Sequence, residues 1–348
     1  MLTKVIPLSV ADNDGLDQIA IRQDRPFVLF GDLSATSNKE WLVRELLGDG
    51  DASTVYGKPG DGKSVLVEDM ALHIAAGRDW HGKRVKQGAV LYIALERKKL
   101  VERRAIAFRD TYDLSNLPFA IMGGVHDFRD PRTAQRIVEI GKDVAEATET
   151  PLRLICIDTL SRALCGGDEN ASKDMGAVVN ATALIQQDTG AHVCWLHHMP
   201  AEAERMRGHG SLLGAMDTTI LVTKSGNLRT ATVIKANDSE EGAQIAFTLE
   251  SVTVGTDAEG NPTTAPIVRP AEASPAFASE GPKLTKNQQT MFSLLQGAGP
   301  AGLTTEQWND QARAVGIGIG RKADLYDIRQ KLKSKELVRQ YGDRWNAC

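Results

Sequence analysis

The stretch VYGKPGDGKSVLVEDMALHIAAG, residues Val55 to Gly77, decides the fold. It contains the full pattern G-x-x-x-x-G-K-[ST], in which glycines let backbone N–H groups turn toward one anion and the lysine reaches the outer phosphates of a nucleotide. The expected phosphate contacts are Gly57, Pro59, Gly60, Asp61, Gly62, Lys63, Ser64 and Val65. The hydroxyl of Ser64 is also an expected ligand of Mg²⁺.

The residues around this loop favour phosphate binding over a chance match. Residues 53–56 read as a short strand, and apolar residues recur at helical spacing from Val65 until Gly77 ends the run. The free N–H groups and positive end of a helix N-terminus favour a bound anion. Strand, loop and helix therefore stand in the order that a nucleotide site needs.

Composition is that of a water-soluble globular chain. The 348 residues are 42% hydrophobic and 25% charged, which suggests about two domains. No apolar run is long enough to span a bilayer, and the first residues lack the pattern of a signal peptide, so we expect a cytoplasmic protein without a membrane partner. The four cysteines show no zinc-binding spacing.

Strand-like and helix-like stretches alternate after the phosphate loop. Strands are expected at 89–95, 119–122, 153–158 and 192–198, with helices between them. Apolar strands that alternate with helices predict an α/β fold, a parallel sheet covered on both faces. From Asp217 the pattern changes to three strands joined by turns, which predicts antiparallel additions at the C-terminal side of this sheet.

We expect three parts in the chain. Residues 1–255 form an ATPase domain with a core of about 27–250, residues 256–282 form a linker rich in Pro, Ala, Ser and Gly, and residues 283–348 form a small domain. Three amphipathic helices and a hairpin turning at Gly342 predict that this last domain is a winged helix. It carries eleven Lys and Arg against six Asp and Glu, whereas the whole chain has a net charge of −4.

Nucleotide hydrolysis also needs a carboxylate for the metal and a group that activates water. Asp158 ends an apolar strand, and the carboxyl ends of such strands face the bound ligand, so Asp158 is the expected second metal residue. Thr159 follows where many ATPases have a catalytic glutamate. Glu96 closes the strand at 89–95 and is therefore the expected general base; the alternative is a surface glutamate.

Two histidines close the strand at 192–198. Adjacent side chains on a strand point to opposite faces, so His197 and His198 cannot easily hold one metal ion. We expect one imidazole to contact the γ-phosphate as a sensor, with His197 favoured over His198. The alternative is a core histidine.

These residues in this order resemble the RecA-like ATPases, and among them the plasmid RepA-type hexameric helicases and their relatives on phages and integrated elements. The resemblance runs from about Phe27 to Leu249 and includes the blocks GRDWHGKRVKQGAVLYIALE, LICIDTLSRAL, CWLHHMP and RMRGHGSLLGAMDTTILV. It implies ATP and Mg²⁺ as cofactors, a homo-oligomer that is a hexamer, and single-stranded DNA as partner. It also implies a basic residue that completes the neighbouring subunit's site. Lys235 is the first candidate and Arg229 the second, because Asn237 stands where the family commonly has a second basic residue.

The resemblance also implies where DNA binds. The loop MPAEAERMRGHGS, residues 199–211, would hold single-stranded DNA through Arg205 and Arg207, although two glutamates in it weaken that assignment. In a winged helix the third helix would offer Arg321, Lys322 and Arg329 to duplex DNA; docking to a replication protein is the alternative.

Two functions follow from these expectations. The first is a ring-forming motor, a DNA helicase or translocase. The second is an ATP-dependent DNA-binding regulator or loader without helicase activity. A metabolic kinase is a distant third, since the chain offers no evident substrate lid.

Overall fold

The computed structural model describes residues 29–32, 39–199, 210–272, 284–318, 322–335 and 337–347. The chain divides into two compact units, Met1–Glu272 and Ala273–Cys348. Within the described residues, no helix combines the length and the apolar character that crossing a membrane requires.

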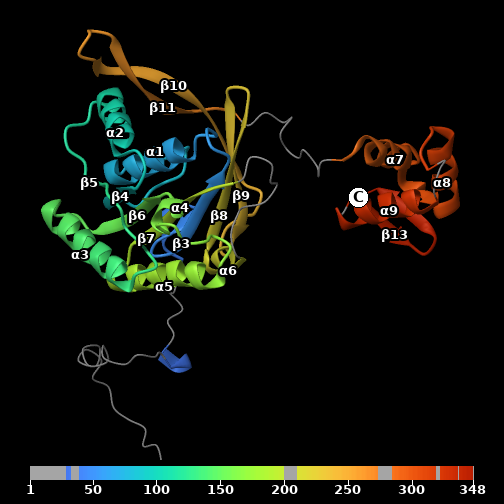
Figure 1. The fold of residues 1–348 in the computed structure, drawn as a ribbon, viewed down its shortest axis with the longest axis horizontal. Helices are drawn as coiled ribbons and strands as arrows, with labels where there is room; N and C mark the ends of the chain where they lie inside the picture. The colour runs from blue at the N-terminus through green and yellow to red at the C-terminus, as the bar shows by residue number, and fades with distance from the viewer. Residues whose placement is uncertain are drawn as a thin grey trace, which may run out of the picture. The chain divides into compact units, whose positions relative to one another are not determined.

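A nine-stranded sheet forms the first unit, in the order β11-β10-β9-β8-β3-β7-β6-β4-β5 (Figure 1). Its strands are β3 (Ala52–Gly57), β4 (Ala89–Ala94), β5 (Phe119–Met122), β6 (Leu152–Asp158), β7 (His192–His198), β8 (Thr218–Ser225), β9 (Leu228–Ala236), β10 (Gln244–Thr256) and β11 (Pro262–Pro270). The six strands from β8 to β5 are parallel to one another, and β9, β10 and β11 are added antiparallel. The predicted α/β fold with antiparallel C-terminal additions is confirmed.

The register of the parallel strands gathers polar residues at one edge. Gly57 at the end of β3 is paired with His198 at the end of β7, and Ala94 at the end of β4 is paired with Asp158 at the end of β6. The carboxyl ends of these four strands therefore lie at the same edge, which is where ligands bind in open α/β sheets.

Helices cover both faces of this sheet. They are α1 (Lys63–Ala76), α2 (Lys98–Tyr112), α3 (Pro131–Ala147), α4 (Leu160–Ala163), α5 (Ser172–Thr189) and α6 (Gly210–Ala215). Helices α1 and α2 lie on one face, and α3 and α5 lie on the other (Figure 1). Two hydrophobic cores result, one under α1 and the other under α3 and α5. A short ribbon of β1 (Trp41–Val43) and β2 (Leu47–Gly48) precedes β3, and a 3₁₀ turn, η1, covers Phe30–Asp32.

The predicted linker at 256–282 begins too early. Strand β11 lies inside that segment and pairs along its length with β10, so the first unit extends to Glu272. Its three prolines, Pro262, Pro266 and Pro270, are spaced by four residues and so turn their nitrogens to one side of an edge strand, where no ladder bond is needed. Ala265 and Ile267 of β11 are buried against Ala107 of α2. The high proline content therefore led to the prediction of a linker where the chain forms strand β11. Residues 273–283 lie outside the described residues.

The second unit has its own core. It contains α7 (Lys286–Gly297), a 3₁₀ turn η3 (Gly299–Ala301), β12 (Leu303–Thr304), α8 (Thr305–Ala314), α9 (Lys322–Ser334), β13 (Val338–Tyr341) and β14 (Arg344–Ala347). Its strands form a small sheet in the order β12-β14-β13. Thr285 and Thr304 cap α7 and α8 through reciprocal capping boxes. Three helices and a hairpin are present as expected, and their identification as a winged helix stays a prediction.

Candidate nucleotide-binding site

The phosphate loop joins β3 to α1 and is shaped by glycines at both ends. Gly62 adopts a left-handed φ of 97° at the N-terminus of α1, and a Cβ there would lie 2.9 Å from Cδ of Arg229. A Cβ at Gly57 would lie 2.3 Å from the carbonyl oxygen of Val222. A side chain at Gly57 would collide with the backbone of β8, and one at Gly62 would strain the left-handed φ and displace the side chain of Arg229, which explains why the loop needs glycine at both.

Polar contacts hold the loop and its lysine. The side chain of Asp61 accepts a hydrogen bond from the backbone N–H of Lys58 at 3.1 Å, and Nζ of Lys63 donates to the carbonyl of Lys58 at 3.0 Å. Lys63 is buried, and burial lowers the pKa of its ammonium, whereas the negative charges of Asp61, Asp158 and Glu96 oppose that shift. The negative charge of these three carboxylates therefore favours the protonated ammonium near the N-terminus of α1.

Asp158 ends β6 and lies beside Ser64. Burial raises the pKa of the Asp158 carboxyl, and hydrogen bonds from Ser64 and Tyr92 oppose this. The phenol of Tyr92 on β4 donates to Oδ2 of Asp158 at 2.9 Å. A hydroxyl and a carboxylate side by side are the hard oxygen donors that suit Mg²⁺, which commonly takes one or two protein ligands and completes its shell with water and phosphate. The residues present fit this ion.

Glu96 lies two residues beyond β4 at the same edge. Its Oε1 accepts a hydrogen bond from the hydroxyl of Thr159 at 3.1 Å, lies 3.9 Å from Nε2 of His198 and lies 3.6 Å from Nε of Arg162. The carboxylate is 31% exposed, so it is open to water while Thr159 fixes one of its oxygens. Such an oriented, solvent-accessible carboxylate can accept a proton from water.

At the end of β7, the histidine that faces the cavity is His198 and not the expected His197. His197 is fully buried and does not line the cavity, whereas His198 does. Alternation along the strand puts them on opposite faces, and the face that meets the cavity belongs to His198. Burial and then the charge of Lys63 lower the pKa of His198, so its imidazole is neutral at pH 7. His198, rather than His197, is the residue that can contact a bound phosphate.

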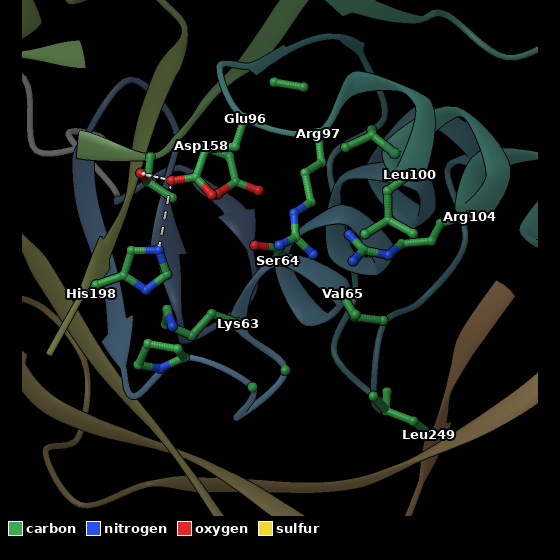
Figure 2. Close-up of a pocket in the computed structure, with 16 residues that line it drawn as sticks. Lys63, Ser64, Val65, Glu96, Arg97, Leu100, Arg104, Asp158, His198 and Leu249 are labelled. Carbon is green, nitrogen blue, oxygen red and sulfur yellow. Dashed lines mark hydrogen bonds and ion pairs between the residues drawn. The ribbon is translucent and has the colours of Figure 1, made fainter. Parts of the chain in front are cut away.

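A cavity of about 390 Å³ brings these groups together (Figure 2). It is lined by Pro59, Gly60, Gly62, Lys63, Ser64, Val65, Ala94, Glu96, Arg97, Leu100, Val101, Arg104, Asp158, Thr159, His198 and Leu249. Charged and hydroxyl groups gather at the strand ends, and Leu100 and Leu249 lie on the opposite side (Figure 2). One end therefore suits a polyphosphate and the other an apolar ring.

A buried hydrogen-bonded pair supports the wall of this cavity. Nη1 of Arg104, on α2, donates to Oε2 of Glu68, on α1, at 3.1 Å. Glu68 is 1% exposed, and burial raises its pKa to about 8 although Arg104 opposes the shift. The pair ties α2 to the phosphate-loop helix one turn beyond Ser64.

Neither candidate for a subunit-bridging residue lines the cavity. Nζ of Lys235 donates to the carbonyls of Met216 and Gly214, at the C-terminal end of α6. Arg229 is buried against the phosphate loop and donates to the carbonyl of Asn227 at 3.1 Å. Both have a structural role within their own chain, and bridging by Lys235 stays a prediction.

The predicted DNA contacts fall into three groups. Arg205, Arg207 and Arg321 lie outside the described residues. Lys322 begins α9, but the placement of its side chain is also outside the description. Arg329 is buried, forms a hydrogen bond with Asn309 and lies 6.0 Å from the ring centroid of Trp345. It belongs to the core of the second unit, so its assignment as a DNA contact is wrong.

Several residues that line the cavity or support its side chains were not predicted from the sequence. Thr159 was noted only as the absence of a glutamate, although a hydroxyl there is what Glu96 binds. Tyr92 is the one polar residue of the strand AVLYIA, a signal that a buried phenol needs a partner. Arg97 and Arg104 belong to a basic stretch, ERKKLVERR, whose inward face only the packing of α2 reveals.

Comparison with known proteins agrees with this geometry. The family model of the AAA domain matches residues 21–204, a segment that contains Lys63, Glu96, Asp158 and His198. A search of curated proteins found no match. Among solved structures, a crystal structure of the RadB recombinase covers 58% of this chain and 88% of its own, with 13% identity and a TM-score of 0.43, a likeness too low to bear on function. The chain therefore belongs to the AAA domain family, as a P-loop ATPase.

Proposed function

We propose that this chain is an ATP-driven motor, a RepA-type DNA helicase or translocase that acts in the replication of a plasmid, a phage or an integrated element. One observation carries the proposal: Glu96 and Asp158 line the same cavity as Lys63 and Ser64. A cavity that only bound nucleotide would not need an oriented carboxylate beside the metal residues. The DNA part is supported by the resemblance of the sequence blocks and by the basic second unit.

The hydrolytic step follows from the placement of the side chains. Backbone N–H groups of the loop and the ammonium of Lys63 bind the outer phosphates. Ser64 and Asp158 would hold Mg²⁺, which neutralises charge on the phosphates. Glu96, fixed by Thr159, accepts the proton of the attacking water.

The side of the cavity opposite the phosphate loop determines which base the nucleotide carries. Leu100, Val101 and Leu249 offer an apolar surface, with the guanidinium of Arg104 beside it. Such a surface suits the flat face of a purine ring. ATP is therefore the proposed substrate.

DNA is proposed to bind through two surfaces. The loop at 199–211 would bind single-stranded DNA through Arg205 and Arg207 in a ring of about six subunits, as the resemblance implies. The second unit would bind duplex DNA or a replication protein through Arg321 and Lys322, and Lys331 and Lys333 are further cations of α9 that are exposed.

Stimulation of ATP turnover by single-stranded DNA tests the motor, together with the mass of the assembly in solution. Replacing Arg205 and Arg207 by Ala should weaken single-strand binding and its stimulation of turnover, and should spare basal turnover. The salt dependence of the remaining binding should be shallower, because fewer counterions are released. A charge-matched control replaces Arg132 and Arg136, two exposed residues of α3. If single-stranded DNA does not change the rate of ATP turnover by the parental protein, the motor function is excluded.

A regulator or loader without helicase activity is the second candidate. It is favoured by one observation, that the basic second unit packs around a core of its own. Deleting residues 283–348 separates the two functions. The motor predicts that stimulation by single-stranded DNA survives the deletion, whereas the regulator predicts that all DNA binding disappears with the second unit.

A further inference from the structure

Arg97 is a third cation in the nucleotide cavity, beside Lys63 and Arg104. It directly follows Glu96 and forms the N-cap position of α2. It lines the cavity together with Lys63 and Ser64. Figure 2 shows its side chain extending from the start of α2 into the cavity, toward the side where Ser64 lies.

The other two cations of the cavity have partners within the chain. Lys63 donates to the carbonyl of Lys58, and Arg104 forms the buried pair with Glu68. Throughout the described part of the chain, by contrast, no carboxylate or carbonyl accepts a hydrogen bond from the guanidinium of Arg97. A guanidinium that faces a phosphate cradle without a partner is free to bind an anion bidentately.

The backbone of Arg97 is fixed although its side chain is not. Its carbonyl accepts hydrogen bonds from the N–H groups of Leu100 at 2.9 Å and Val101 at 3.3 Å, which begin helix α2. On its other side, Glu96 is held by Thr159. The backbone that carries the guanidinium is therefore held in place directly next to the proposed general base, Glu96.

We propose that Arg97 contacts the γ-phosphate of ATP and stabilises its charge during hydrolysis, from within the same chain. This inference rests on the proposed ATPase function. In the step, the water oxygen forms a bond to the γ-phosphorus while the bond from that phosphorus to the bridging oxygen breaks. The electron pair of the broken bond stays on ADP, and the proton of water passes to Glu96. Arg97 binds oxygens of the transferring group, where the negative charge of the transition state is spread.

The proposal changes what a neighbouring subunit must supply. Lys235 and Arg229, the cations expected to bridge subunits, are both engaged inside their own chain. A cation provided in cis would supply to basal turnover a charge that need not come from the neighbour.

Substitution of Arg97 tests its contribution. Arg97→Ala should lower kcat by about 10³-fold, the range of an arginine that stabilises phosphoryl transfer, and raise KM for ATP, with little change in affinity for ADP. Arg97→Lys should retain part of the activity, because a lysine keeps the charge without the planar fork. The matched control is Arg103→Ala, an exposed arginine on the same helix that does not line the cavity. Turnover of the Arg97→Ala protein equal to that of the control would overturn the proposal.

A mixing experiment decides between cis and trans. Lys63→Ala subunits keep Arg97 but cannot hold the phosphates, and Arg97→Ala subunits keep the cradle. If Arg97 acts within its own chain, a mixture of the two has no more activity than its parts. Recovery of turnover on mixing would show that the arginine serves a neighbour, and would overturn the proposal in its cis form.

The failure of this inference can be told apart from failure of the proposed function. Absence of turnover in the parental protein would refute the ATPase function alone. In that case, the affinity of the Arg97→Ala protein for nucleotides tests the proposed contact of Arg97. The contact predicts that Arg97→Ala loses the preference of the parental protein for a non-hydrolysable ATP analogue over ADP, and an unchanged preference contradicts it.

Discussion

The nucleotide-binding edge of the sheet and the second unit differ in how they use their charged residues. At the sheet edge, Lys63, Glu96 and Asp158 all line one cavity. In the second unit, the arginine chosen as a DNA contact, Arg329, lies in the core under Trp345. Charge in the sequence therefore indicates a site only where the fold also fixes the direction of the side chain.

Sheet topology explains why residues of the site could be predicted at the sheet edge. Parallel strands all point their carboxyl ends the same way, so residues that close different strands meet whatever their distance in sequence. A charged residue on a helix can lie on either the exposed or the buried face, so its presence in the sequence alone does not place it at a site. Arg329 lies four residues after Leu325 and three before Leu332, both buried, so the spacing itself places it on the inward face of α9.

Loss of the phosphate-loop lysine is the largest effect that this comparison predicts. Lys63→Ala should lower ATP turnover by at least about 10³-fold, because charge on the transferring phosphate loses its main fixed cation. Phosphate release measures this, and thermal unfolding shows whether the fold is kept. Turnover at the parental rate would mean that the loop is not a phosphate cradle.

The two histidines give a sharper test within the same edge. His198→Ala should slow turnover by about 10²-fold, the size of one lost donor to the reacting group. His197→Ala should instead lower the free energy of unfolding by about 2 kcal/mol and leave turnover of the folded protein close to parental, because it removes a buried side chain. Steady-state kinetics and denaturant unfolding of both variants separate the roles. A catalytic loss confined to His197→Ala would restore the original assignment.

Arg329 offers the corresponding test in the second unit. Arg329→Ala should destabilise that unit by about 2 kcal/mol, because it removes a buried guanidinium and leaves Asn309 without its partner. Lys331→Ala, a substitution of an exposed cation two residues away, should leave stability unchanged and weaken DNA binding modestly. Unfolding of the second unit, followed by fluorescence of its tryptophans, measures the difference. An Arg329→Ala unit of parental stability but weaker DNA binding would return Arg329 to the surface.

Much of the fold could be predicted from sequence, and the reason is periodicity. The parallel strands and their helices carry strong apolar patterns, whereas β11 has three prolines and was missed. Within the site, the phosphate loop, Asp158 and Glu96 follow from motif and strand ends. Thr159 and Tyr92 could not be assigned, because their roles depend on hydrogen bonds between neighbouring strands that no spacing reveals.

The smallest predicted effect concerns the side of α1 away from the cavity. Asp69 is buried and accepts a hydrogen bond from Nε1 of Trp80 at 2.8 Å, and burial raises its pKa to about 7. The unfolded chain ionises this group near pH 4, so the stability of the neutral form is lost as the pH rises toward 7. Asp69→Asn should keep the bond and gain on the order of 1 kcal/mol relative to the parental protein between pH 5 and pH 7. Denaturant unfolding at both values checks this, and equal differences at the two would contradict it.

The account depends most on Glu96 as the general base. The direct measurement is ATP turnover by Glu96→Gln with Mg²⁺, alongside nucleotide binding and a control, Glu102→Gln, that changes an exposed glutamate of α2. We predict that Glu96→Gln binds ATP and Mg²⁺ as the parental protein does and turns over at least about 10²-fold more slowly, while the control is unaffected. Turnover of Glu96→Gln at the parental rate, with binding intact, would contradict the central claim and place the base elsewhere.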